Sequence, residues 1–318
     1  MTGPARRRAW ALQLAIVALV AALAWALIAH ALSAQRARGI QAGFGFLWQP
    51  AGFAIGEGWL SFDPAQSFGR AFAVGLGNTV RVALPAIVLA TVLGTLIGLG
   101  RLARYAPARL ACTAYVELLR NVPLLVQLLM WYFALTSLLP DAGAPWRLPG
   151  GAFLSKGGLS IPWPGAGRPA LGPFNVSGGA ALTPEFLAVL VALAVYTAAF
   201  VAEVVRAGVQ AVPAAQVQAA QAQGLRPAQI TRHIVAPQAL RVIIPSLTNQ
   251  YLNLTKNSTL GVAVGYPELV SISNTTLNQT GRAFECVTII TALYLALSLL
   301  TAAALGRGNA RVALRGLT

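Results

Sequence analysis

Long apolar runs constrain the fold of this chain more than any other feature of its sequence. A helix of about 20 mostly apolar residues can cross a bilayer, because it pairs its own backbone N–H and C=O groups where no water is present. Only 10% of the 318 residues are charged, against about a quarter in soluble proteins. The runs of this length are residues 9–32, 76–100, 112–139, 185–206, 243–266 and 285–306. We therefore expect an all-α integral membrane protein with six transmembrane helices.

The basic residues indicate how such a chain is oriented. The formal net charge is +15, but the Lys and Arg residues are scattered between the apolar runs, so nucleic acid is not an expected partner. If Arg6, Arg7 and Arg8 are cytoplasmic, the segments on their side carry more Lys and Arg than the opposite segments. The positive-inside rule then predicts that both termini are cytoplasmic. The first run exceeds the core of about 7–15 residues in a signal peptide, and we expect it to be retained as a span.

Two long segments between the runs, residues 33–75 and 140–183, are rich in Gly, Pro and aromatic residues. Such composition favours turns and short extended pieces over helices. In the orientation above, both segments are extracytoplasmic loops. Thr183, Pro184 and Glu185 supply a hydroxyl cap, a proline in the first turn and an acid near the helix N-terminus, which predicts that the next helix begins there.

The chain divides into an N-terminal span and loop, residues 1–74, a five-span unit, residues 75–306, and a tail, residues 307–318. Within the unit, Gly94 and Gly98 have the small-residue spacing that lets membrane helices approach closely. We expect an ordinary packing role for them.

No catalytic or cofactor motif is present in the sequence. It contains no nucleophile elbow, no metal-ligand cluster and no phosphate-binding loop. Cys112, Cys286, His30 and His233 are far apart and have no metal-binding spacing. We therefore expect that the chain is not an enzyme and binds no metal or cofactor.

The run at 243–266 is unusually polar for a membrane helix. Asn249, Asn253, Lys256 and Asn257 follow an i, i+4, i+7, i+8 spacing, which places them on one helical face. Lys256 lies about 16 Å along the helix from Pro245, so we expect it near the middle of the bilayer. An ionisable group at that depth indicates a functional site. The alternatives are a structural pair with a carboxylate on another span, or a position at a helix end.

Two acidic residues in other runs are candidate partners. Glu203 and Glu117 are each followed by an arginine three residues later, Arg206 and Arg120, on the same helical face. For Glu117 we favour a local ion pair near the inner surface. For Glu203 both a local pair and a place in a substrate pathway remain open.

Four stretches together resemble a known family. "NTVRVALPAIVLATVLGTLIGLGRL", "ELLRNVPLLVQLL", "YTAAFVAEVVRAGVQAVP" and "QAAQAQGLRPAQITRHIVAPQALRVIIP" occur in the order seen in permease subunits of polar amino acid importers of the ATP-binding cassette (ABC) class. The resemblance covers about residues 74–306. It implies a type I ABC importer transmembrane domain.

The last stretch resembles the cytoplasmic EAA loop of that family, here at about residues 210–241, with Gln218 in place of the usual glutamate and Ala236 in place of the usual leucine. In the family this loop forms a short coupling helix that docks into the ATPase subunit. Ala-rich sequence favours such a helix, and Gly224 is expected to end it. The residues expected in the loop's contact are Gln218, Ala219, Ala220, Gly224, Leu225, Arg226, Pro227, Ile234 and Pro237.

The resemblance also implies partners. These are an ABC ATPase dimer that carries ATP and Mg²⁺, a second similar or identical permease, a periplasmic amino-acid-binding protein and the bilayer of the bacterial inner membrane. The run "YLNLTKNSTLGVAVGYPELVSISNTTLNQTGRAFE" looks most like the general L-amino acid branch.

An amino acid substrate has two charges that a membrane site must solvate. Lys256 and the Asn amides are candidates for its carboxylate, and Glu203 or amide oxygens for its ammonium group. The expected pathway residues are Glu203, Asn249, Asn253, Lys256 and Asn257. Three alternatives remain open: an ion-coupled secondary transporter, an ABC permease for an opine or osmolyte, and a membrane scaffold that transports nothing.

Overall fold

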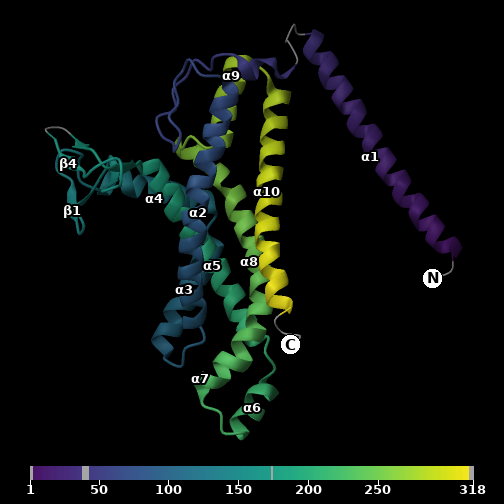
Figure 1. The fold of residues 1–318 in the computed structure, drawn as a ribbon, viewed down its shortest axis with the longest axis vertical. Helices are drawn as coiled ribbons and strands as arrows, with labels where there is room; N and C mark the ends of the chain where they lie inside the picture. The colour runs from purple at the N-terminus through teal and green to yellow at the C-terminus, as the bar shows by residue number, and fades with distance from the viewer. Residues whose placement is uncertain (1–2, 38–42, 173–174, 315–318) are drawn as a thin grey trace.

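The structure is a computed structural model that describes residues 3–37, 43–172 and 175–314. Figure 1 shows a long helical bundle with a small strand-rich insert on one side and α1 apart from the bundle. The helices of the bundle are α2 (Phe68–Gly100), α3 (Ala106–Asn121), α4 (Leu124–Leu138), α5 (Pro184–Gln210), α6 (Ala214–Ala222), α7 (Pro227–Ile230), α8 (Ala236–Asn257), α9 (Leu269–Thr280) and α10 (Ala283–Leu314). The remaining helical elements are α1 (Gly3–Ala37), the 3-10 helices η1 (Phe44–Trp48) and η3 (Ser258–Val264), and the π-helical turn η2 (Thr231–Val235).

Four helices in the described part of the chain are long and apolar enough to cross a membrane, and the bent pair of α3 and α4 makes five if it forms one span, so the expected number of six stays a prediction. The four are α2, α5, and the apolar stretches Trp10–Leu27 of α1 and Ala283–Gly306 of α10. The predicted run 112–139 is not one straight helix, because α3 and α4 meet at a bend of 105°. Pro123 is the reason, since a residue before proline is held in the extended region, and Val122 has φ −91° and ψ 126°.

The predicted run 243–266 is also not a single α-helix. α8 ends at Asn257 and the chain continues as the 3-10 helix η3. Asn, Ser and Thr are weak helix formers, and the Ser258 hydroxyl donates a hydrogen bond to the carbonyl of Thr255. Gly265, with φ +82°, then ends the segment.

Strands occur only between α4 and α5 in the described residues, which confirms short extended pieces in the segment 140–183. β1, β2, β3 and β6 form one antiparallel sheet in that order, and β4 pairs with β5. Leu154, Leu159 and Leu182 of this insert pack against the main hydrophobic core. The strands are β1 (Trp146–Leu148), β2 (Ala152–Ser155), β3 (Gly158–Ile161), β4 (Ala170–Leu171), β5 (Val176–Ser177) and β6 (Ala180–Leu182).

α5 is the central helix of the bundle and contacts α2, α3, α4 and α8. Its start is the one predicted: the Thr183 hydroxyl accepts a hydrogen bond from the N–H of Phe186 at 3.1 Å, with Pro184 in the first turn. The packing role of Gly94 and Gly98 is confirmed too. A Cβ on Gly94 would lie 2.5 Å from Val201 Cβ, and one on Gly98 would lie 2.6 Å from the carbonyl oxygen of Ala202.

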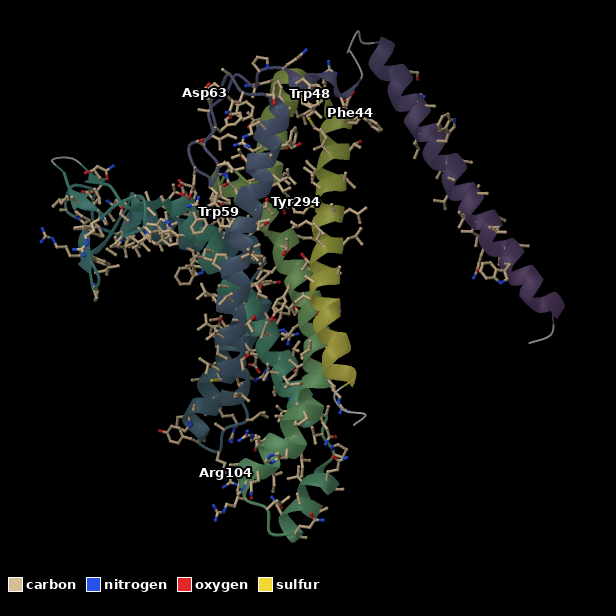
Figure 2. All side chains as sticks on the ribbon, in the orientation of Figure 1. Phe44, Trp48, Trp59, Asp63, Arg104 and Tyr294 are labelled. Atoms are coloured by element: carbon tan, nitrogen blue, oxygen red, sulfur yellow. The ribbon has the colours of Figure 1, made fainter. Side chains whose placement is uncertain are left out.

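The bundle has two ends, each formed by a different set of elements. We call the end formed by η1, α9 and the starts of α2 and α10 the α9 end, and the end formed by α6, α7 and the α2–α3 turn the α6 end (Figure 1). Figure 2 shows Phe44 and Trp48 at the α9 end and Arg104 at the α6 end.

Candidate functional site

Three cavities follow one another along α5. The first borders Thr183 and Glu185 at the start of the helix, the second borders Tyr196 and Phe200, and the third borders Phe200 and Glu203. Eleven residues of helix separate Glu185 from Tyr196, a rise of about 16 Å. The cavities therefore form a series from the α9 end toward the α6 end, and we call them the α9-end, middle and α6-side cavities.

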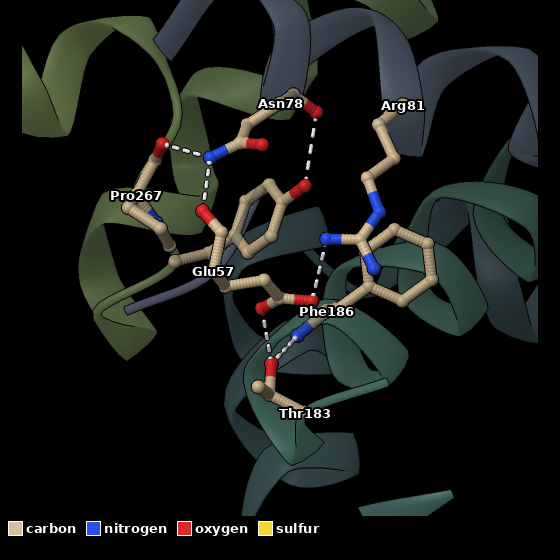
Figure 3. A network of polar contacts seen from close by, with 7 residues as sticks. Glu57, Asn78, Arg81, Thr183, Phe186 and Pro267 are labelled. Atoms are coloured by element: carbon tan, nitrogen blue, oxygen red, sulfur yellow. Dashed lines mark hydrogen bonds and ion pairs between the residues drawn. The ribbon is translucent and has the colours of Figure 1, made fainter. Parts of the chain in front are cut away.

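The α9-end cavity has a volume of about 410 Å³. Its walls come from residues 53–57 of the loop before α2, from the start of α5, and from residues 265–275 around the start of α9. A buried polar network anchors this loop (Figure 3). The Glu57 carboxylate forms an ion pair with Arg81 at 2.8 Å and accepts a hydrogen bond from the Thr183 hydroxyl. The side chains of Glu57 and Arg81 are only 8% and 11% exposed.

Asn78 completes the network from α2. Its side-chain amide nitrogen donates to the backbone oxygens of Glu57 and Pro267, each at 2.9 Å, and its backbone carbonyl accepts from the Tyr266 hydroxyl. The Arg81 guanidinium also lies over the Phe186 ring, 4.8 Å from its centroid. The network therefore joins the loop, α2, α5 and the turn before α9. Sequence reasoning missed Glu57 and Arg81, because their pairing spans a loop whose path has no periodic pattern.

A hydrophobic layer separates the α9-end cavity from the middle cavity. Leu128, Val189, Leu193 and Tyr266 are buried in one core cluster at this level of α5. A residual void beside Leu260 and Gly261 has no room for a water molecule. Buried apolar side chains therefore lie between these two cavities along α5.

The middle cavity has a volume of about 300 Å³ and combines amides with aromatic rings. α8 contributes Gln250, Asn253 and Asn257, and α5 contributes Tyr196 and Phe200, whose rings lie 4.9 Å apart between centroids. Such a cavity offers amide N–H donors, amide oxygen acceptors and ring faces within one partly open space. The remaining lining residues are Thr197 and Leu254.

Two of the predicted pathway residues on α8 line this cavity and two do not. Asn253 and Asn257 are in its wall, whereas Asn249 and Lys256 do not line it; Asn253 is itself exposed and Asn257 is half-buried. Gln250 was missed, although its i, i+3, i+7 spacing with Asn253 and Asn257 is an equally good helical face.

Lys256 occupies the last turn of α8, where a cation is favoured by the helix dipole. The structure therefore agrees with the alternative interpretation of Lys256, in which it lies at a helix end. None of the ion pairs among the described residues includes Lys256. A direct role of Lys256 in a pathway stays a prediction.

The α6-side cavity has a volume of about 440 Å³ and is lined by charged groups from three helices. The Glu203 carboxylate forms ion pairs with Arg101 from the end of α2 and with Arg206 from its own helix. The predicted local pair of Glu203 and Arg206 is therefore confirmed. The lining residues are Arg101, Val116, Glu117, Arg120, Asn121, Phe200 and Glu203.

The favoured pair of Glu117 with Arg120 is wrong for the described structure. No ion pair between them occurs among the described residues. The Arg120 guanidinium instead lies over the Phe200 ring, 5.1 Å from its centroid. The aromatic face of α5 competes with the carboxylate for this guanidinium, an effect that spacing along α3 alone does not reveal.

The predicted EAA-type loop forms α6, α7 and the lead-in to α8 at the α6 end. α6 begins at Ala214, before the expected Gln218, and Gly224 ends it with φ +77°. The N–H of Leu225 donates to the Ala220 carbonyl and that of Gly224 to the Gln221 carbonyl, which is a Schellman motif. α7 then starts at Pro227, the change of direction expected there.

Two buried residues hold this loop together while its outer surface is open. Ala220 and Ile230 are each 4% exposed, whereas Gln218 and Ala219 face solvent. The Gln238 amide of α8 donates to the Gln216 amide oxygen of α6 at 2.6 Å. α6 is therefore joined to α8, the same helix that lines the middle cavity.

A family model described as "Binding-protein-dependent transport system inner membrane component" matches residues 86–313. The general L-amino acid transport system permease protein AapQ of Rhizobium johnstonii is 38% identical to this chain, over 95% of it and 91% of the relative. The putative amino-acid ABC transporter permease protein YhdX of Escherichia coli is also 38% identical, over 96% and 94%.

Solved structures are similar to the same region. The crystal structure of an amino acid ABC transporter with histidines matches with a TM-score of 0.59 and 27% identity, covering 77% of this chain and 95% of that chain. An inward-facing MetNI methionine ABC transporter matches with a TM-score of 0.54 and 19% identity, covering 76% and 96%. The latter likeness concerns the fold alone.

Proposed function

The chain belongs to the family of binding-protein-dependent transport system inner membrane components and is a permease subunit of an amino acid ABC importer; we propose that it moves α-amino acid zwitterions through the middle cavity by alternating access. The polar amino acids of the general L-amino acid branch are the proposed substrates, since the relative at 38% identity carries that name. ATP hydrolysis belongs to a separate ATPase subunit, and this chain supplies the path.

The middle cavity is the single observation that carries this proposal. A zwitterion that leaves water needs donors for its carboxylate and acceptors or ring faces for its ammonium group. The amides of Gln250, Asn253 and Asn257 offer N–H donors and oxygen acceptors. The rings of Tyr196 and Phe200 offer faces that attract a cation. Neutral amides bind both charges weakly enough for release, as transport requires.

The closed layer and the loop at the α6 end support the alternating-access part of the proposal. The buried layer around Leu193 and Tyr266 lies between the middle cavity and the α9 end, where a closed gate would be expected. α6 is joined to α8 through Gln216 and Gln238, so a movement of α6 on a docked ATPase would be transmitted to the cavity wall. In this account the α6 end and both termini are cytoplasmic, the α9 end receives substrate from a binding protein, and a second permease completes the complex.

A related substrate class is the second candidate. The octopine transport system permease protein OccM of Rhizobium radiobacter is 29% identical over 76% of this chain. An opine keeps the amino acid carboxylate and a charged nitrogen, so the same amides would serve it. The higher identity of the amino acid relatives favours the first candidate.

The test is uptake by the complex reconstituted in proteoliposomes with its ATPase and binding protein. We expect Asn253→Ala and Asn257→Ala each to lower ATP-dependent uptake of L-[³H]glutamine or L-[³H]glutamate by about tenfold, the effect of removing one hydrogen bond to a charged group of the substrate. Asn249→Ala is the matched control, because Asn249 lies one helical position outside the cavity wall and is exposed. Equal uptake by all three variants would rule out the middle cavity as the path.

A further inference from the structure

The α6-side cavity contains two charged groups that the structure leaves available. Glu203 is not one of them, because Arg101 and Arg206 already bind its carboxylate. The available pair is Glu117 and Arg120, which both line the cavity and both belong to α3. Among the residues that the structure describes, neither side chain takes part in an ion pair.

The spacing of these two groups fits one small ligand. Residues three apart on a helix have Cβ atoms about 5–6 Å apart, so both side chains can reach groups carried by a single carbon atom. The guanidinium carbon of Arg120 lies over the Phe200 ring, 5.1 Å from its centroid. A guanidinium over a ring can still present N–H groups to a ligand, and its fork of N–H groups matches a carboxylate with two hydrogen bonds.

The rest of the cavity is suited to an amino acid. Its volume, about 440 Å³, exceeds that of the middle cavity and lies within the range of small-molecule sites. Asn121 adds a neutral hydrogen-bonding group, while Val116 and Phe200 provide apolar wall. Phe200 also lines the middle cavity, so its ring stands between the two spaces.

We propose that the α6-side cavity is a second, exit-side binding site for an α-amino acid zwitterion, in which Arg120 binds the α-carboxylate and Glu117 binds the α-ammonium group. This inference rests on the proposed function, because it takes the same substrate class and places the site after the middle cavity. An amino acid bound here holds Arg120 and Phe200 in place between the cavities. High concentrations of substrate on the α6 side therefore slow further passage.

The experiment measures binding and transport on the full complex. The permease with its ATPase is placed in nanodiscs without binding protein, and equilibrium binding of L-[³H]glutamine is measured. We expect the binding curve of the wild type to have two components. Glu117→Gln and Arg120→Gln each weaken one component by about tenfold or more, as expected for the loss of a charge-assisted hydrogen bond, and change the other by less than about twofold.

Two controls separate charge from fold. Arg109→Gln removes an exposed arginine of α3 that does not line the cavity, and it leaves both components as in the wild type. The exchanged double variant Glu117→Arg/Arg120→Glu keeps both charges and recovers part of the weakened component. N-acetyl-L-glutamine lacks the ammonium charge, so in the wild type it competes poorly with L-[³H]glutamine for this component. In Glu117→Gln it competes as well as unlabelled L-glutamine does.

A single binding component in the wild type would overturn the second site. So would two components that Glu117→Gln and Arg120→Gln leave unchanged. If the wild-type complex neither bound nor took up any amino acid, the proposed function would be wrong, and so would the second site. The two failures are thus distinguished, because the first leaves ATP-dependent uptake intact.

Discussion

At the scale of single residues, the choice of helical face decides which polar side chains of α8 line the middle cavity. The polar residues of α8 are compatible with two neighbouring helical faces. One face includes Asn249 and Lys256, and the other includes Gln250. Asn253 and Asn257 belong to both faces. The structure places the second face against Tyr196 and Phe200 of α5. The sequence pattern of α8 alone does not show which face lines the cavity, because this depends on how α5 packs against α8. Asn253 and Asn257 were predictable, whereas Gln250 required the packing of α5.

The Glu57 network gives a prediction at the same scale. Replacing Glu57 by Ala leaves Arg81 buried without its partner, which costs about 3 kcal/mol. We expect the loop to open more often, so the amides of Ala51 and Gly52, which donate to the carbonyls of Gln66 and Pro64, exchange hydrogen about a hundredfold faster in mass-spectrometric measurements. Asp63→Ala is the control, since Asp63 is an exposed acid of the same loop. Unchanged exchange in Glu57→Ala would show that the ion pair does not hold the loop.

At the scale of helices and turns, the sequence predicted starts and stops better than bends. The cap at Thr183 and the stop at Gly224 are local, and both are confirmed. The bend of 105° between α3 and α4 has a local cause in Pro123. Its size depends on how α4 packs on α5, which hydropathy along the chain does not report. The strands of the insert pair mostly with near neighbours in the sequence, but the pairing of β3 with β6 joins residues about 20 positions apart, which no short pattern reports.

The contact of α2 with α5 predicts a strict preference for glycine at one position. In Gly98→Ala the new Cβ would lie 2.6 Å from the Ala202 carbonyl oxygen, so the helices must separate. We expect a loss of about 1–3 kcal/mol in stability, measured as a lower midpoint in thermal unfolding of the purified complex. Gly77→Ala is the matched control on α2, because nothing lies within 4 Å of its added Cβ. It should be neutral or slightly stabilising, as Ala favours helix. Equal midpoints for both variants would contradict this packing.

The stop of α6 predicts an effect on coupling that depends on backbone conformation alone. Gly224 has φ +77° and open space around its added Cβ. Gly224→Ala therefore strains the backbone by about 1–2 kcal/mol, whereas Gly224→Asn is tolerated better in this conformation. We expect amino-acid-stimulated ATPase activity to fall in the Ala variant and to be largely retained in the Asn variant. If the two variants lose activity equally, the left-handed turn is not what positions α6.

At the scale of the whole molecule, the cavities, the closed layer and the α6 loop form one arrangement along α5. In the proposed function, substrate would enter from the α9 end, rest in the middle cavity and leave past Phe200, and α6 would connect the path to the ATPase. The family and the general architecture follow from motifs and apolar runs, and the comparisons confirm them. The order of the cavities does not follow from sequence, since it arises from contacts among α2, α3, α5 and α8.

The most direct test of this account is the energy source of transport. Proteoliposomes that contain the permease, its ATPase and its binding protein are prepared in two ways: with ATP and Mg²⁺ inside, or with an ion gradient across the membrane and no ATP. Uptake of L-[³H]glutamine is then followed in both. The account predicts uptake only with hydrolysable ATP, together with amino-acid-stimulated hydrolysis, and no effect of ionophores. Uptake that persists without ATP and collapses when an ionophore removes the ion gradient would contradict it.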